Sequence, residues 1–149
     1  MELQTQNNPA SGFEKLKIEL AKLAKDNSLG QANLEYEVIE IDVPTANSTV
    51  SIPKTTRVEH KKVVGLFIFS PNFADYKSTM HLSIGQKDVM GSDKIAVNIH
   101  SKDDYLSVND VAFKTDIDVN NSPIKVDYYD GGAITTPYTI FLYLICVKN

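Results

Sequence analysis

The chain has 149 residues and a formal net charge of −4 at pH 7, with 42% hydrophobic and 23% charged residues. These are ordinary values for a globular protein of one domain, and they exclude a chain that is disordered throughout. Lys and Arg are scattered along the sequence, so a dedicated nucleic-acid surface is not expected; the dense basic pair Lys61-Lys62, preceded by His60, is predicted to start an exposed strand.

The N-terminal third of the sequence begins with a polar segment and continues as a helix. Residues 1–10 are rich in Asn and Gln and predict a flexible arm. A helix is predicted over residues 11–30, because Ser11 and Glu14 can form a capping box and Gly30 can end the helix. Its apolar side chains form one stripe, made of Phe13, Leu16, Leu20 and Leu23. Since so short a helix is marginal alone in water, the stripe is expected to dock on its own domain or on a neighbouring subunit.

From Leu34 onward the hydrophobic pattern alternates, as in β-strands. In the first strand the apolar phase changes between Val38 and Ile39, and this slip predicts a β-bulge. The second strand is interrupted by Pro53 and is therefore expected at a sheet edge. Eight strands are predicted, over residues 34–43, 50–58, 62–70, 79–84, 94–100, 111–119, 124–129 and 137–147.

The third and the last of these strands are apolar on both faces, which requires a cover on each side. In the last strand Phe141, Tyr143 and Ile145 share one face, and the other face is also apolar. In a jelly roll the eighth strand lies between the first and the third, so the two doubly apolar strands would be interior neighbours. An immunoglobulin-like sandwich is less favoured because the chain has no Trp and one Cys.

The predicted fold is therefore mainly β. Residues 31–149 are expected to form a single domain, an eight-stranded antiparallel β-sandwich of jelly-roll type, with one N-terminal amphipathic helix. Seven side chains are predicted to form an interface, either between the helix and the sheet of this domain or with a neighbouring molecule: Phe13, Leu16, Leu20, Leu23, Phe141, Tyr143 and Ile145.

No motif for catalysis or cofactor binding occurs in the sequence. There is no nucleophile–base pair, phosphate-binding glycine loop or dinucleotide fingerprint, so an enzyme is not expected and no cofactor is predicted. His60, His81 and His100 lack zinc-ligand spacing, although they could meet across strands, and they are interpreted as strand-end or outward-facing residues. Cys146 is predicted to be a small buried hydrophobe.

One acidic segment resembles a calcium-binding loop in part. Asp116, Asp118, Asn120 and Asp127 have oxygen-ligand spacing, but Asn121 occupies the position that such loops give to Gly. Alternating carboxylates on an exposed strand produce the same spacing without an ion. These four residues are the weak calcium candidates, and no metal site is otherwise predicted.

The order of polar arm, short helix and eight strands resembles the small single-jelly-roll capsid proteins, such as the penton or vertex proteins of tailless icosahedral phages, with the strand pattern running from Leu34 to Val147. The resemblance implies a structural protein that self-assembles, with copies of itself or other capsid subunits as partners, and that resides in a virion. The alternative is a sugar- or surface-binding module of lectin or tail-fibre type, with a site made of Tyr105, Tyr129, Asp127 and Asp130.

The start of the chain and its longest apolar runs bear on localisation. Met1 and the residues after it lack the basic start and apolar run of a signal peptide, and no apolar stretch reaches the roughly 20 residues of a membrane span. Cytoplasmic synthesis without a signal peptide, and no membrane span, are therefore expected.

Overall fold

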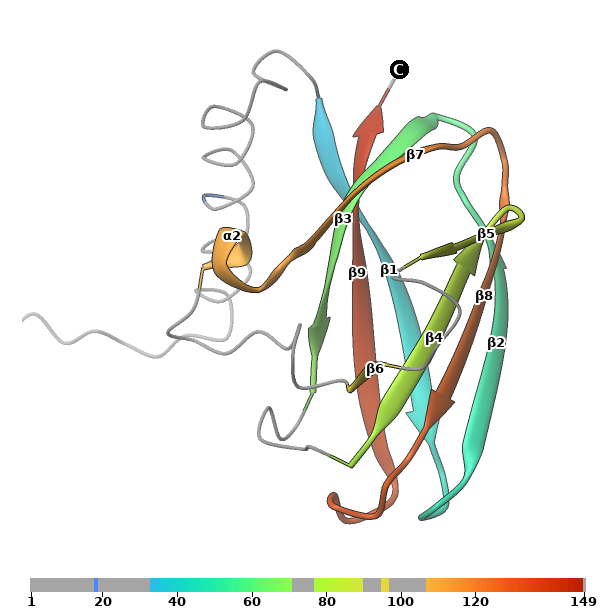
Figure 1. Cartoon of the computed structure of the whole chain (residues 1–149), viewed down its shortest axis with the longest axis vertical. Helices are drawn as coiled ribbons and strands as arrows, with labels where there is room; N and C mark the ends of the chain where they lie inside the picture. Colours follow the sequence, from blue (N-terminus) through green and yellow to red (C-terminus); the bar gives the residue numbers. More distant parts are fainter. Residues whose placement is uncertain (1–17, 19–32, 71–76, 90–94, 97–106, 149) are drawn as a thin grey trace, which may run out of the picture.

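The computed structural model describes residues 18, 33–70, 77–89, 95–96 and 107–148. This part of the chain is mainly β and forms two antiparallel sheets that pack face to face (Figure 1). The elements are β1 (Leu34–Val43), β2 (Thr49–Thr55), β3 (His60–Phe69), β4 (Thr79–Ile84), β5 (Lys87–Val89), β6 (Ile95–Ala96), α2 (Val108–Val111), β7 (Phe113–Asp118), β8 (Pro123–Tyr129) and β9 (Tyr138–Lys148).

The strand order places the chain's last strand in the middle of a sheet. The first sheet has the order β1-β9-β3-β7, and the second has the order β2-β8-β4-β5, with β6 pairing the other end of β4. The prediction that the two doubly apolar strands are interior neighbours is confirmed by β3 and β9. The edge position predicted for the strand with Pro53 is confirmed by β2, which lies at the end of the second sheet and, among the described strands, pairs only with β8.

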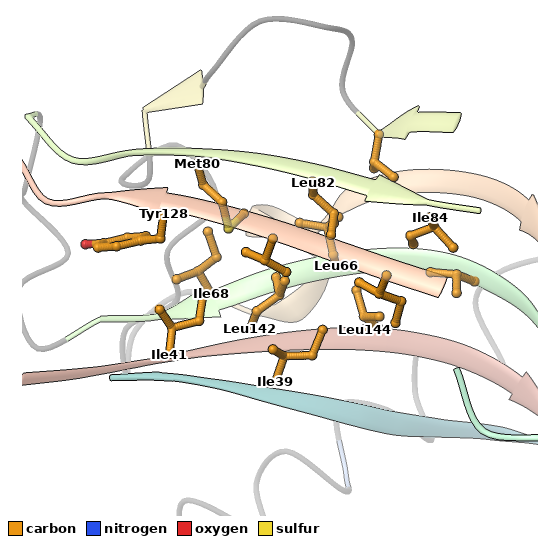
Figure 2. Close-up of a cluster of buried hydrophobic side chains, with 14 of the residues drawn as sticks. Ile39, Ile41, Leu66, Ile68, Met80, Leu82, Ile84, Tyr128, Leu142 and Leu144 are labelled. Atoms are coloured by element: carbon orange, nitrogen blue, oxygen red, sulfur yellow. The ribbon is translucent and has the colours of Figure 1, made fainter. Parts of the chain in front are cut away.

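The core lies between the two sheets and is built by strand alternation (Figure 2). The first sheet contributes Ile39, Ile41, Leu66, Ile68, Leu142 and Leu144, and the second contributes Met80, Leu82, Ile84, Val126 and Tyr128. All of these side chains are buried, and each contributes about 1.5–3 kcal/mol through removal of apolar area from water.

The outer face of the β1-β9-β3-β7 sheet carries a second apolar layer. Phe67 is fully buried and stacks on Tyr143 with ring centroids 5.0 Å apart, and Tyr36 contacts both rings edge-on. Buried Ile145 joins this layer, and the short helix α2 packs Val108 and Val111 into it. The outer face was expected to need a cover, and α2 covers it around Phe67 and Ile145. The sequence pattern did not indicate this helix.

The predicted bulge in the first strand is wrong. β1 pairs β9 in unbroken register from Leu34↔Val147 to Val43↔Tyr138. The irregularities lie in β3 instead, the second between Val63 and Gly65. The hydrophobic phase in β1 changes because Glu35 and Glu37 occupy the same face as the core residue Ile39.

Several other predictions meet the structure only in part. The predicted strand 94–100 is described only at Ile95–Ala96, and the short strand β5 was not predicted. The arm 1–10 and the stripe residues Phe13, Leu16, Leu20 and Leu23 lie outside the described residues; Ile18, which is not in the stripe, is helical and exposed. No helix within the described ranges is long and apolar enough to cross a membrane.

Candidate functional site

A cluster of ionisable side chains lies inside one end of the first sheet, where β1 and β3 begin and β9 ends. β1 supplies Glu35 and Glu37, β3 supplies its first residue His60, and β9 supplies Cys146. Glu35 is the register partner of Cys146, and His60 is the partner of Lys148, so the four side chains meet across three neighbouring strands. We call Glu35, Glu37, His60 and Cys146 the buried cluster.

His60 lies at the centre of the buried cluster between two carboxylates. Its side chain is fully buried, with Nδ1 2.8 Å from Glu37 Oε2 and Nε2 2.6 Å from Glu35 Oε1. A neutral imidazole donates through one nitrogen only. Both contacts can be hydrogen bonds only if the cluster holds one more proton than a neutral ring and two carboxylates supply.

Glu37 has one satisfied and one unsatisfied oxygen. Oε2 contacts His60 and accepts a hydrogen bond from the backbone N–H of Arg57 at 3.3 Å. Oε1 is buried and has no hydrogen-bond partner among the residues that the structure describes. An unpaired buried carboxylate oxygen is costly, so this atom is an exception that needs an explanation.

Cys146 places a thiol beside Glu37 and His60 in the buried cluster. One ligand atom from each of Glu37, His60 and Cys146 lies within 4.8 Å of the others. Burial, with the nearby carboxylates of Glu37 and Glu35, raises the pKa of the Cys146 thiol to about 12. The thiol is therefore protonated at neutral pH, and Sγ lies 3.7 Å from Leu144 O as a weak hydrogen-bond donor.

Glu35 forms the outer rim of the cluster. Its side chain is 31% exposed and lies near two cations, with Lys148 Nζ at 3.6 Å and Arg57 Nη1 at 4.0 Å. The hydrogen bond from His60, helped by Lys148 and opposed by partial burial, holds the pKa of Glu35 below its ordinary value. Glu35 is therefore the ionised partner of the His60 ring on the solvent side.

A second buried polar group lies at the other end of the sandwich, around Asp130. The fully buried Asp130 accepts hydrogen bonds from the Tyr138 hydroxyl, from Asn47 N at 2.8 Å and from Gly132 N at 3.2 Å. The Tyr128 hydroxyl lies 3.0 Å from that of Tyr138. Both oxygens of Asp130 have donors within the fold, so this carboxylate holds the loops in place.

Three of the four residues proposed for a sugar site lie within the described ranges. Asp130 is enclosed, and Asp127 pairs with Ser51 Oγ at 2.5 Å and with Lys125 Nζ at 3.7 Å. Tyr129 is half-buried, and Tyr105 lies outside the described residues.

The weak calcium candidates lie on different sheets. Asp116 and Asp118 are exposed on β7, where Lys62 Nζ lies 2.7 and 3.6 Å from their carboxylates. Asn120 lies in the following turn and Asp127 lies on β8 of the second sheet. The spacing along the sequence therefore reflects alternation on an exposed strand, and Lys62 supplies the positive charge between the two aspartates.

The structure confirms the predicted burial of Cys146, but the sequence did not indicate which residues lie beside it. His60 was interpreted as part of an exposed strand start, whereas its side chain is fully buried; of the other two histidines, His81 pairs with Asp88 at 3.0 Å and His100 lies outside the described residues. The available signal was the phase change in the first strand, which indicates inward carboxylates if the strand is regular. Comparisons with protein-family models, curated proteins and solved structures find no match to this chain.

Proposed function

We propose that this protein is a non-enzymatic structural subunit that assembles with copies of itself through the outer face of the β1-β9-β3-β7 sheet. The scaffold that we propose is a jelly roll. Its support is the strand order, because β9 lies between β1 and β3 and β8 lies between β2 and β4, as a jelly roll requires when the two-residue β6 is counted as an addition.

The observation that carries the proposal is a partly exposed apolar patch on the outer sheet face. Val38 and Phe141 are 36% and 37% exposed, and both neighbour half-buried aromatic residues, since Val38 is the register partner of Tyr143 and Phe141 that of Phe69. We call Val38, Phe69, Phe141 and Tyr143 the outer patch. Apolar surface with aromatic side chains and a polar rim is typical of protein–protein interfaces, and exposed Glu40 opposite Phe141 supplies such a rim.

The specific form that we propose is a virion capsid subunit of penton type. Its partners would be further copies of the chain or other capsid subunits, meeting through head-to-tail contacts that close into rings. The resemblance in strand pattern supports this form.

The proposal is tested by the mass of the full-length protein in solution. We expect oligomers by analytical ultracentrifugation, and we expect Phe141→Asp to convert them to monomers because it places a charge in the outer patch. Val58→Asp is the matched control: Val58 is 72% exposed, but it lies two residues before His60, at the opposite end of β3 from Phe69. A strictly monomeric wild type, or equal masses for wild type and Phe141→Asp, would contradict the proposal.

Removing residues 1–30 tests the contribution of the predicted arm and helix separately. Loss of assembly in this truncated chain, with unchanged stability of the sandwich, is the result expected if these residues connect neighbouring subunits. Unchanged assembly would assign the contact to the sheet face alone.

A further inference from the structure

We propose that Glu37, His60 and Cys146 bind one zinc ion inside the sandwich, and that Glu35 holds the His60 ring in the orientation that the ion needs. This site is independent of the assembly proposed above. It gives the protein a metal-dependent stabilising element in a chain that has a single cysteine and therefore no internal disulfide.

The ligand set fits zinc in chemistry and in position. Thiolate, imidazole and carboxylate are the groups that bind Zn²⁺ in proteins, whereas a sulfur ligand disfavours Ca²⁺ and Mg²⁺. Bond lengths of about 2.0–2.3 Å place tetrahedral zinc ligands roughly 3.5 Å apart. The ligand atoms of Glu37, His60 and Cys146 already lie within 4.8 Å of one another, so small side-chain movements close the site.

The unpartnered oxygen of Glu37 points to a cation independently of this spacing. Oε1 is buried with no donor among the described residues, although its carboxylate is fully enclosed. Neither a solvent-exposed carboxylate nor a fully hydrogen-bonded one would leave such an atom. A bound ion gives this oxygen of Glu37 a positive partner.

Glu35 fixes which nitrogen of His60 binds the ion. With Nε2 2.6 Å from Glu35 Oε1, the ring proton belongs on Nε2, and the lone pair of Nδ1 then faces Glu37. Carboxylate–histidine–zinc arrangements use the same division between the two ring nitrogens. The ion thus takes the place of the proton that would otherwise be needed between Nδ1 and Glu37.

The charges balance when the ion is bound. As the Zn–S bond forms, the Cys146 S–H bond breaks and its proton passes to solvent. Zn²⁺, the Glu37 carboxylate and the Cys146 thiolate then sum to zero in a buried site, and the charge of Glu35 is balanced at the rim by Lys148 and Arg57. Without the ion, the fold encloses a carboxylate with incomplete compensation, which is expensive.

A second acidic group shares the same histidine. Glu35, Glu59 and His60 also bring ligand atoms within 4.8 Å, but this group has no thiol and, among the described residues, no buried oxygen that lacks a partner. We therefore assign the ion to the inner group. Glu59→Gln serves to separate the two positions.

The test uses the full-length protein, refolded with chelator to remove bound metal and then refolded with ZnCl₂ or CoCl₂, because the site is enclosed. We expect one metal ion per chain, and we expect the cobalt form to show the near-ultraviolet thiolate-to-cobalt band. Cys146→Ala should lose that band and bind zinc at least 100-fold more weakly. Glu35→Gln should keep the band and weaken binding about 10- to 100-fold, as outer-shell partners do.

Two controls make the result decisive. His81→Ala removes a partly exposed histidine that pairs with Asp88 on the other sheet, and Glu59→Gln removes the outer alternative; both should bind zinc as wild type does. The proposal is overturned if wild type binds no stoichiometric zinc, if the cobalt form lacks the thiolate band, or if Cys146→Ala retains wild-type affinity. The wild-type cobalt spectrum decides by itself should Cys146→Ala fail to fold.

Discussion

The buried carboxylate of Asp130 holds three separate segments of the chain together through hydrogen bonds. It accepts hydrogen bonds from Asn47 in the segment after β1, from Gly132 in the segment after β8 and from Tyr138 at the start of β9. Asp130→Ala leaves these three donors without an acceptor in a buried place, so we expect the free energy of unfolding to fall by about 3 kcal/mol or more. Urea unfolding measures the loss.

The matched control for this prediction is Asp127→Ala on β8. Asp127 is half-buried and pairs with Ser51 and Lys125 at the surface. Its removal should cost about 1 kcal/mol or less. Similar losses for the two variants would show that Asp130 does not hold the loops.

Tyr138 gives the stability of the protein a dependence on alkaline pH. Burial, followed by the hydrogen bonds with Asp130 and Tyr128, raises the pKa of Tyr138 above its ordinary value, whereas an unfolded tyrosine ionises near pH 10. The stabilisation is therefore fully present below about pH 10 and is lost as the pH rises above it, because only the unfolded chain releases the proton there. In Tyr138→Phe the free energy of unfolding should fall less steeply than in wild type between about pH 9.5 and 11. Parallel slopes from denaturant unfolding would contradict this assignment.

Among the strands, β1 and β3 differ in how the hydrophobic pattern of the sequence relates to the regularity of the backbone pairing. β1 has an irregular hydrophobic pattern and a regular backbone, because Glu35 and Glu37 are core-facing residues in an unbroken ladder. β3 has a nearly continuous apolar sequence, yet its pairing shifts between Val63 and Gly65. A hydrophobic pattern therefore reports what each face of a strand packs against, and it locates a bulge only when the buried face is wholly apolar.

Gly65 lies beside the irregularity in β3 and is closely packed. A Cβ there would lie 3.2 Å from Ile145 Cδ1 and 3.3 Å from the carbonyl oxygen of Phe113 on the neighbouring β7. The Ile145 side chain can move, but the backbone carbonyl cannot without disturbing the β3–β7 ladder. We expect Gly65→Val to lower the free energy of unfolding by about 1–3 kcal/mol through overpacking.

Gly85 provides the contrast because its constraint is conformational. Its φ is +63°, and a Cβ there would meet nothing within 4 Å. Since Asn adopts this left-handed region more readily than most residues, Gly85→Asn should change the free energy of unfolding by less than about 1 kcal/mol. Thermal unfolding measures the stability of both variants. A Gly65→Val protein as stable as wild type would exclude the steric explanation.

At the scale of the whole molecule, the two proposed properties lie on different parts of the same sheet. The buried cluster is on the inner face near Lys148, and the outer patch is on the opposite face near Phe141. Phe141→Asp should therefore alter mass in solution while leaving zinc stoichiometry unchanged, and Cys146→Ala should do the reverse. Joint loss of both properties in either variant would indicate that the ion supports the assembly surface.

Much of the β architecture could be predicted because strand alternation is a local property. The alternating segments, the edge position of the strand with Pro53 and the interior position of the two doubly apolar strands all follow from residues adjacent in sequence. β5 and α2, with three and four residues, are too short for their periods to stand out. The helix stripe from Phe13 to Leu23 lies outside the described residues and stays a prediction.

The order of apolar and polar side chains along the chain was enough to predict most of the strands and the two strands that require cover on both faces, because both properties depend on residues adjacent in sequence. That Glu35, Glu37, His60 and Cys146 meet could be seen only in the tertiary structure, since those on different strands are 23 to 111 positions apart in the chain and their meeting depends on β9 lying between β1 and β3. In sequence Cys146 is an apolar residue among others; beside His60 and the unpartnered oxygen of Glu37 it becomes a candidate metal ligand. The physical reason is that burial alone can be inferred from local pattern, whereas the charge that a buried group faces is set by its neighbours in space.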